Sequence, residues 1–555
     1  MFRNLKYKKS IVSILLLIVF IFLINIIVSF AIEKKLTELL LNNNSKYYVA
    51  SIEKVNFKLI TRSLILKGIF LSPTNDVISD LKRGKSSKNT LEKISVSSIK
   101  LKGIGLFKLV FKNSIEVNTL SINNLLIQKF EISNLSKKKV KEKISLNIDS
   151  IYINTLNGVQ IRKIKLANFK FQVFNFSTNK ITFQNSPISF ETSGFKLEKY
   201  DEHLFKLKPI DDIIEIHDIN LNFEKLKYQF LIDVISYNFS KHIIAIEKVH
   251  LKPLQDRKVL ANTYKYNKDV FDVFISDLKI YNYNLAKTLN LEGVFIDSII
   301  ASGLEIDIYK DKRKPFDTDE RPKLPHMALK QMKMPLHINK IKIDNGNLKL
   351  ENRLNKRDVS MKISMDDIHA QITNITSIKT LREKPLKVDI KAKFMKSSDM
   401  QVNIVFPLKD NQNTFYFNGS LGPVKLRMFD TAIFPVLGLK VLKGDLDGLT
   451  FSASANNISS SGKMTMLYHD LEAEVYKSNS LEENKFLSWT VNRVIRGSNP
   501  GKNNKIREVT MQYNRSDYKG IGNYFWKTLQ SGIVNTMAPF GIKTEKEKKR
   551  KKITN

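Results

Sequence analysis

The residues best suited to chemistry in this chain are its eight histidines, because the sequence contains no cysteine. A metal site would be predicted if ligands recurred at a short spacing, as in the H-E-x-x-H pattern on a helix. No histidine of this chain has such a partner nearby in the sequence. Four of them lie beside apolar positions of a repeated strand pattern, where an outward-facing position explains them more simply: His217, His250, His337 and His369. The sequence predicts no metal site and no thiol chemistry.

The sequence contains partial matches to catalytic or phosphate-binding motifs, but no complete one. The segment 497–503 (GSNPGKN) resembles a phosphate-binding loop, but it is one residue short, lacks a hydroxyl residue after Lys502 and follows no apolar strand. No G-x-S-x-G nucleophile motif occurs. Acids such as Asp366 and Asp367 are adjacent, so on a strand they point to opposite faces. We therefore predict no catalytic residues, no cofactor and no enzymatic activity.

The most frequent pattern in the chain is a repeat of apolar residues at positions i, i+2, i+5 and i+7. On a helix these positions fall at about 0°, 200°, 140° and 340°, which is no common face. On a strand, a one-residue bulge between the two pairs would place all four side chains on one face. The alternative is a tight turn joining two very short strands; both readings are β, and the bulged strand is favoured. The copies span Ile94–Leu101, Ile115–Ile122, Leu146–Ile153, Val159–Leu166, Ile214–Leu221, Ile244–Leu251, Val273–Ile280 and Leu336–Ile343.

A fold class follows from one apolar and one polar face sustained over most of the chain. We expect a mainly β protein: an N-terminal transmembrane helix, then an elongated, curled antiparallel β-sheet with few short helices. A sheet of so many strands must curl, split or close. A curled sheet with an apolar concave side is a groove, whereas a collapsed one is a sandwich core. The spacing alone leaves both open.

The first residues predict a membrane anchor. Four cations before residue 10 precede the apolar run Ile11–Ile32, which as a helix would be roughly 33 Å long, enough to cross the hydrocarbon core. A cleavable secretion signal would have a shorter apolar region and a small-residue cleavage site, and neither is present. The positive flank predicts a cytoplasmic N-terminus and an exported body. The anchor residues are Ile14, Leu16, Phe20, Leu23 and Ile27.

Composition suggests further divisions. Pro73–Lys93 is expected to be a polar loop, 310–335 a Pro-rich linker with one short helix at Met327–Met332, and Asn523–Met537 a helix. That last helix either packs on the end of the sheet or lies on a membrane surface. The predicted parts are a basic flank (1–10), the anchor (11–32), a short helix and linker (33–48), a first β segment (49–309), the linker (310–335), a second β segment (336–519), an amphipathic helix (520–541) and a basic tail (542–555).

The net charge of +37 has two interpretations. One is an anionic partner, either nucleic acid or the head groups of a membrane. The other is that abundant lysine is solvated decoration. Nucleic acid is disfavoured behind an export anchor, and the chain has no zinc-finger spacing or RNA-binding aromatic signature. A membrane surface remains the predicted charged partner.

Two stretches resemble a known family. The stretch from Leu324–Pro325 through Leu336–Gly346 is similar to a recurrent strand unit that ends in an Asn/Asp-Gly turn. Later, Val441–Leu449 leads to Gly462–Met464 and Tyr468–Leu471. That order is similar to a strand-Gly-x-Leu-x-x-Leu unit followed by a Gly…Tyr-x-Asp-Leu strand. With the anchor, these stretches resemble the AsmA-like proteins of Gram-negative envelopes, which are relatives of bridge-like lipid-transfer proteins.

The resemblance implies an elongated, taco-shaped β groove lined by apolar side chains. It implies a single-pass inner-membrane protein with a periplasmic body that binds phospholipids and passes them toward the outer membrane, with the outer membrane or an envelope protein as a further partner. At 555 residues the chain is short for a bridge. The alternative is a non-enzymatic scaffold or outer-membrane assembly factor with a closed core. The predicted groove-lining residues are Ile148, Ile151, Ile216, Ile219, Val249, Val273, Ile275, Leu278, Ile338 and Ile341.

Overall fold

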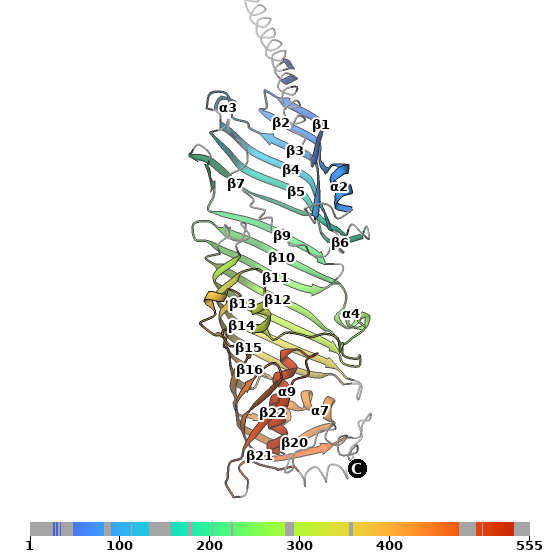
Figure 1. The fold of residues 1–555 in the computed structure, drawn as a ribbon, viewed down its shortest axis with the longest axis vertical. Helices are drawn as coiled ribbons and strands as arrows, with labels where there is room; N and C mark the ends of the chain where they lie inside the picture. The colour runs from blue at the N-terminus through green and yellow to red at the C-terminus, as the bar shows by residue number, and fades with distance from the viewer. Residues whose placement is uncertain are drawn as a thin grey trace, which may run out of the picture. The chain divides into compact units, whose positions relative to one another are not determined.

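The computed structural model describes most of the chain, and contacts divide it into two compact units, Met1–Lys241 and His242–Asn555. Both units are mainly β, as predicted, with few helices (Figure 1). The described residues are 48–82, 90–112, 114–131, 157–175, 180–201, 204–223, 226–283, 293–354, 359–476, 495–501 and 503–537, together with 26, 27, 29, 30 and 34.

The first unit is a sheet with two branches. Strands β1 to β4 pair antiparallel in chain order, and β5 pairs with β4. Along one part β5 pairs with β7, which pairs with β8; along another part β5 pairs with β6. Strand β6 pairs in turn with β9, and β9 with β10. The elements are β1 (Tyr48–Lys58), β2 (Ser63–Pro73), α2 (Asn75–Lys82), β3 (Thr90–Lys102), α3 (Leu106–Lys112), β4 (Ser114–Glu131), β5 (Gly158–Asn175), β6 (Lys180–Asn185), β7 (Ile188–Asp201), β8 (Leu204–Pro209), β9 (Ile213–Phe223) and β10 (Tyr228–Asn238).

The second unit pairs its strands in the order β11–β12–β13–β14–β15–β16–β17–β18–β20–β21–β22, with the short β19 also on β20. Its elements are β11 (Ile243–Pro253), α4 (Arg257–Thr263), β12 (Asp269–Tyr281), β13 (Val294–Asp311), α6 (Pro325–Gln331), β14 (Leu336–Arg353), β15 (Met361–Thr376), η2 (Lys379–Leu381), β16 (Leu386–Phe394), β17 (Ser398–Phe406), β18 (Phe415–Leu421), β19 (Val424–Lys425), η3 (Leu426–Phe429), α7 (Asp430–Leu437), β20 (Leu439–Ala455), β21 (Ser459–Val475), β22 (Glu508–Asn514) and α9 (Ile521–Met537).

The repeated spacing lies on continuous strands, while the one-residue bulge within them stays a prediction. Each copy within the described residues lies inside one strand; Ile94–Leu101, for example, lies wholly within β3. The β2–β3 ladder skips Gly68 and Ser97 and then resumes in the same register. Gly68 has a φ of 59°, in the left-handed region that glycine adopts readily. The tight-turn reading is therefore wrong for these copies, while Leu146–Ile153 lies outside the described residues.

The expectation of a wholly antiparallel sheet is wrong at two places. Strands β4 and β5 pair parallel in the first unit, and β13 and β14 pair parallel in the second. Parallel neighbours need a connection that returns the chain to the starting edge, unlike the short turn of a hairpin. The segment 312–335 makes that return between β13 and β14, so this Pro-rich stretch joins two paired strands of one unit. Helix α6 lies within it and overlaps the helix predicted there.

The segment Pro73–Lys93 also differs from its prediction as a loop. It contains α2, and β3 already begins at Thr90. The sequence Asn75–Lys82 carries Val77, Ile78 and Leu81 at helical spacing within a polar setting, which explains a short surface helix.

The predicted anchor falls almost entirely outside the described residues: Ile14, Leu16, Phe20 and Leu23 are not among them. Ile27 is helical and 66% exposed. The described part of the chain includes no helix that combines the length and apolar character needed to cross a membrane.

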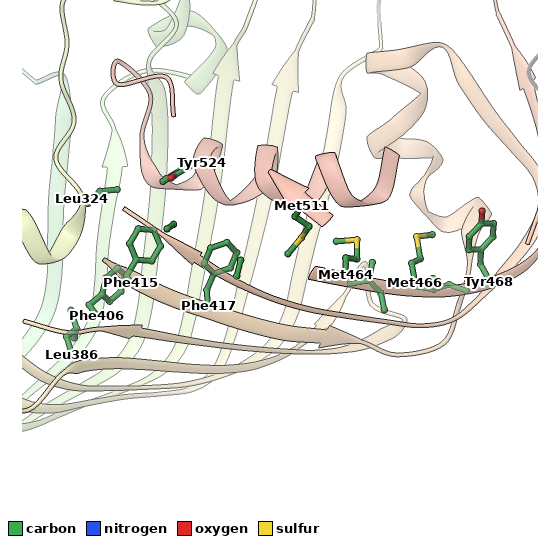
Figure 2. Packing of buried hydrophobic residues seen from close by; sticks show 14 of the residues in the cluster. Leu324, Leu386, Phe406, Phe415, Phe417, Met464, Met466, Tyr468, Met511 and Tyr524 are labelled. Atoms are coloured by element: carbon green, nitrogen blue, oxygen red, sulfur yellow. The ribbon is translucent and has the colours of Figure 1, made fainter. Parts of the chain in front are cut away.

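Helix α9 closes one end of the second unit by packing against β21 and β22. Its buried residues, Tyr524, Thr528, Gly532 and Thr536, recur every four positions and so form one face. Figure 2 shows the core between this helix and the strands, with Phe417, Met464 and Met511 among its side chains. The helix predicted at Asn523–Met537 is confirmed, and its apolar face packs on the sheet.

Candidate functional site

Apolar residues form continuous rows across the strands of the second unit, because paired residues share a face. These rows lie side by side on one surface of the sheet, which we call the apolar face. One row contains Ile280, Ile299, Ile341, Ile372, Val388, Ile404, Phe417 and Ala453, from β12 to β20. A neighbouring row contains Leu278, Ala301, Ile343, Ala370, Ile390 and Val402.

Coverage of the apolar face changes along these rows. Toward the C-terminus, Phe417 and Ala453 are 3% and 6% exposed, because they belong to the core that α9 covers. Toward β12, Ile280, Ile299 and Ile341 are only half-buried. The same row is thus a closed core at one end and a partly exposed aliphatic surface at the other.

The first unit carries comparable rows. One contains Ile52, Ile69, Val96 and Leu125, and another contains Val55, Leu66, Ile99, Ile122, Leu166 and Phe190. Beside these rows, Phe57, Ile104 and Val117 form a small buried cluster. Most other members of the rows are half-buried. An aliphatic surface of this kind can bind hydrocarbon without directional bonds.

The structure groups the predicted groove-lining residues that it describes. Ile216 and Ile219 of β9 pair with Ile235 and Ile232 of β10 in the first unit. In the second unit Val249 pairs with Ile275, Leu278 belongs to one of the two rows and Ile341 to the other. Val249 is 7% exposed, whereas the others are half-buried: Ile216, Ile219, Val273, Ile275, Leu278, Ile338 and Ile341. Ile148 and Ile151 lie outside the described residues, and the groove-lining role itself stays a prediction.

Several members of the apolar face were not among the predicted groove-lining residues: Ile246, Ile299, Ile343 and Ile372. Each of them pairs across the sheet with a predicted groove-lining residue, or with a residue that itself pairs with one. For example, Ile246 pairs with Leu278, and Ile299 pairs with Ile341. Their alternation with polar residues in the sequence could have found them. Their membership in one row could not be read from the sequence, because it depends on strand register.

The opposite face of the second unit carries a polar row. A cross-strand set of Lys342, Gln371, Asp389 and Asn403 runs beside the apolar row of Ile341. A hydrogen bond from Lys342 holds the pKa of Asp344 below its usual range. His369 contacts Asp367 and Asp344 at 3.1 and 3.5 Å and is half exposed. Within the residues that the structure describes, no three His, Asp or Glu side chains are grouped to hold a metal ion.

Comparison with known proteins adds no relative: no family model matches the chain, and no curated protein matches it.

Proposed function

We propose that this chain binds phospholipids by laying their acyl chains on the half-exposed part of the apolar face. In this proposal it is a membrane-anchored envelope protein that passes lipids between the inner and outer membranes. The predicted anchor and the resemblance to AsmA-like proteins suggest the inner membrane and the periplasm. The observation that carries the proposal is the rows of aliphatic side chains that remain half-buried across successive strands.

Burial energy favours capture. Each methylene removed from water contributes about 0.8 kcal/mol, so an acyl chain on the face gains several kcal/mol. Members of a row are nearly all Ile, Leu, Val or Ala, for example Ile280, Ile299 and Ile341. Such uniform contacts lack a polar barrier, which favours sliding along the row over fixed binding. The polar head group would stay in water.

A scaffold is the second candidate function, and one observation favours it. The core under α9, with Phe415, Met464 and Met511 at 0–1% exposure, is closed. That part of the second unit resembles an ordinary protein core and could serve to hold an envelope partner.

The experiment that separates these functions measures lipid on the full chain. The protein, extracted from membranes in mild detergent, would be analysed by native mass spectrometry for retained phospholipids. We expect several phospholipids per chain, and a several-fold loss in the variant Ile275→Glu/Ile341→Glu, because each substitution places a charge on the apolar face.

A matched control adds the same two charges to the opposite face, in the variant Gln371→Glu/Gln401→Glu. Both glutamines are exposed, and Gln371 is paired with Lys342 on the polar side. This control should retain lipid like the wild type. Absence of lipid from a wild-type chain with an intact β spectrum would overturn lipid binding and favour the scaffold.

A further inference from the structure

Two lysines lie at the C-terminal end of β13, at the border of the apolar face: Lys310 within the strand and Lys312 just after it. Lys310 follows Ile306 and Ile308 at alternate positions, so its side chain lies on the same face as theirs. Lys310 is in register with Asp269 of β12, and their side chains form an ion pair at 2.9 Å. Lys312 follows directly, where its backbone N–H donates to the carbonyl of Arg353. Here the aliphatic surface gives way to positive charge.

The segment after β13 brings this edge to the residues that precede α9. Phe316 and Tyr518 have ring centroids 6.1 Å apart, and the Lys519 Nζ lies 4.2 Å from the centre of the Phe316 ring. The Arg321 guanidinium pairs with Asp517 at 3.0 Å. These contacts hold Lys519, and Lys527 in the second turn of α9, near Lys310 and Lys312.

The four lysines act on one another electrostatically. Burial, with Lys310, Lys519 and Lys527 nearby, lowers the pKa of Lys312 to about 8. Burial also lowers the pKa of Lys519 and of Lys527, with contributions from Lys310 and Lys519 respectively. Lys312 nevertheless retains an exposed surface.

Counter-charge around these four lysines is scarce. Asp269 pairs with Lys310, and among the described residues no carboxylate lies within ion-pair distance of Lys312, Lys519 or Lys527. The Lys527 Nζ donates to Oε1 of Gln530 at 2.7 Å, which supplies no charge. Crowded, partly desolvated ammonium groups repel one another unless an anion joins them. The adjoining Ile306 and Ile308 favour an anion that carries hydrocarbon.

We propose that Lys310, Lys312, Lys519 and Lys527 bind the phosphate group of an anionic phospholipid whose acyl chains lie on the adjoining apolar face. This inference rests on the proposed lipid binding and specifies its ligand class. Lysine ammonium groups form charge-assisted hydrogen bonds to phosphate oxygens. A head group with net negative charge would offset the excess of cations, whereas a zwitterionic one would bring its own cation into the cluster.

The test compares head groups on the full chain. Protein in mild detergent would be equilibrated with equal amounts of phosphatidylglycerol and phosphatidylethanolamine, and the bound lipids would be counted by native mass spectrometry. We expect phosphatidylglycerol to be enriched on the wild type. The variant Lys312→Met/Lys519→Met, which keeps the apolar stems, should lower that enrichment about tenfold, since charge-assisted hydrogen bonds are lost.

The control variant Lys349→Met/Lys387→Met removes the same charge from exposed positions that pair with Ser364 and Thr373. It should keep the wild-type preference, and circular dichroism would verify the fold of both variants. Lipid bound without a head-group preference, or a preference that both variants lose equally, would overturn this inference and leave lipid binding intact. No lipid on the wild type would overturn the proposed function as well. A final measurement is calorimetry with inorganic phosphate. If the protein binds phosphate but no lipid, the lysine cluster is a site for a free anion and the inference is overturned.

Discussion

At the scale of single residues, Lys312 has the clearest thermodynamic consequence. An unfolded lysine has a pKa near 10.4, whereas burial lowers the pKa of Lys312 to about 8. Between these values the unfolded chain binds the proton and the folded chain does not, so stability rises with pH over this window. Below pH 8 both states are protonated, and the full cost of the charged side chain opposes folding. The groups facing it are Lys310, Asp269, Lys519 and Lys527.

The variant Lys312→Met should therefore be more stable than the wild type at pH 7, with a gain that shrinks as the pH rises from 8 toward 10.5. The measurement is the urea unfolding midpoint of both proteins at pH 7 and at pH 10. A difference between the two proteins that is independent of pH would show that the ammonium charge is not the cause.

At the scale of elements, the recurring spacing requires a local break in the alternation of side chains, such as the predicted bulge. A bulge shifts the alternation by one residue, so apolar pairs on either side of it remain on one face. Gly303 of β13 takes a φ of 63°, and a Cβ there would lie 2.5 Å from the Ser276 hydroxyl. Asn345 takes the same left-handed region in β14. Each such residue lets its strand follow its neighbours without losing the apolar row.

Helix α9 depends on a close approach at Gly532. A Cβ built there would lie 2.7 Å from Cγ of Met511 and 2.8 Å from Sδ of Met464. The substitution Gly532→Leu should therefore cost roughly 1–3 kcal/mol of stability through overpacking. The measurement is the urea unfolding midpoint.

Gly522 of the same helix offers a matched control, because a Cβ there would meet nothing within 4 Å. Gly522→Ala should leave the midpoint unchanged or raise it slightly, since alanine favours helix. Equal effects at the two glycines would contradict the packing of α9 on Met464 and Met511.

At the scale of the whole molecule, stability is distributed unevenly. The core under α9 contains residues as buried as Phe415 and Met511, at 0% exposure, whereas the rows near β12 are half-buried. Local opening is easiest where few apolar contacts are buried. A surface that must admit and release hydrocarbon would be drawn from that less stable part.

Hydrogen exchange should reveal this difference. Amides of β18, β21 and β22 should exchange slowest, and those of β11 to β13 should exchange faster. Added phospholipid should slow exchange in β11 to β13 and leave β18 to β22 unchanged. The measurement is exchange followed by mass spectrometry on the full chain, with and without lipid. Slower exchange in β11 to β13 than in β22 before lipid is added would contradict the proposed division.

Local patterns were enough to predict the β class, the continuous strands that contain the repeated spacing and the helix at the C-terminal end. The reason is that side-chain alternation, a one-residue bulge and a helical face are set by residues a few positions apart. The spacing at Val273–Ile280, for instance, already specifies which side chains of β12 share a face. It also picked out Ile275 and Leu278, although not the strands that would lie beside them.

The tertiary structure alone decided what lies against those faces. The return of the chain through 312–335 makes β13 and β14 parallel, and it brings Lys312 toward Lys519 and Lys527, some two hundred residues later in the sequence. Likewise, Phe417 and Ile341 belong to one row, yet only Phe417 is covered by α9. Coverage, register and charge clustering depend on contacts between segments distant in sequence, which a period of two residues does not encode.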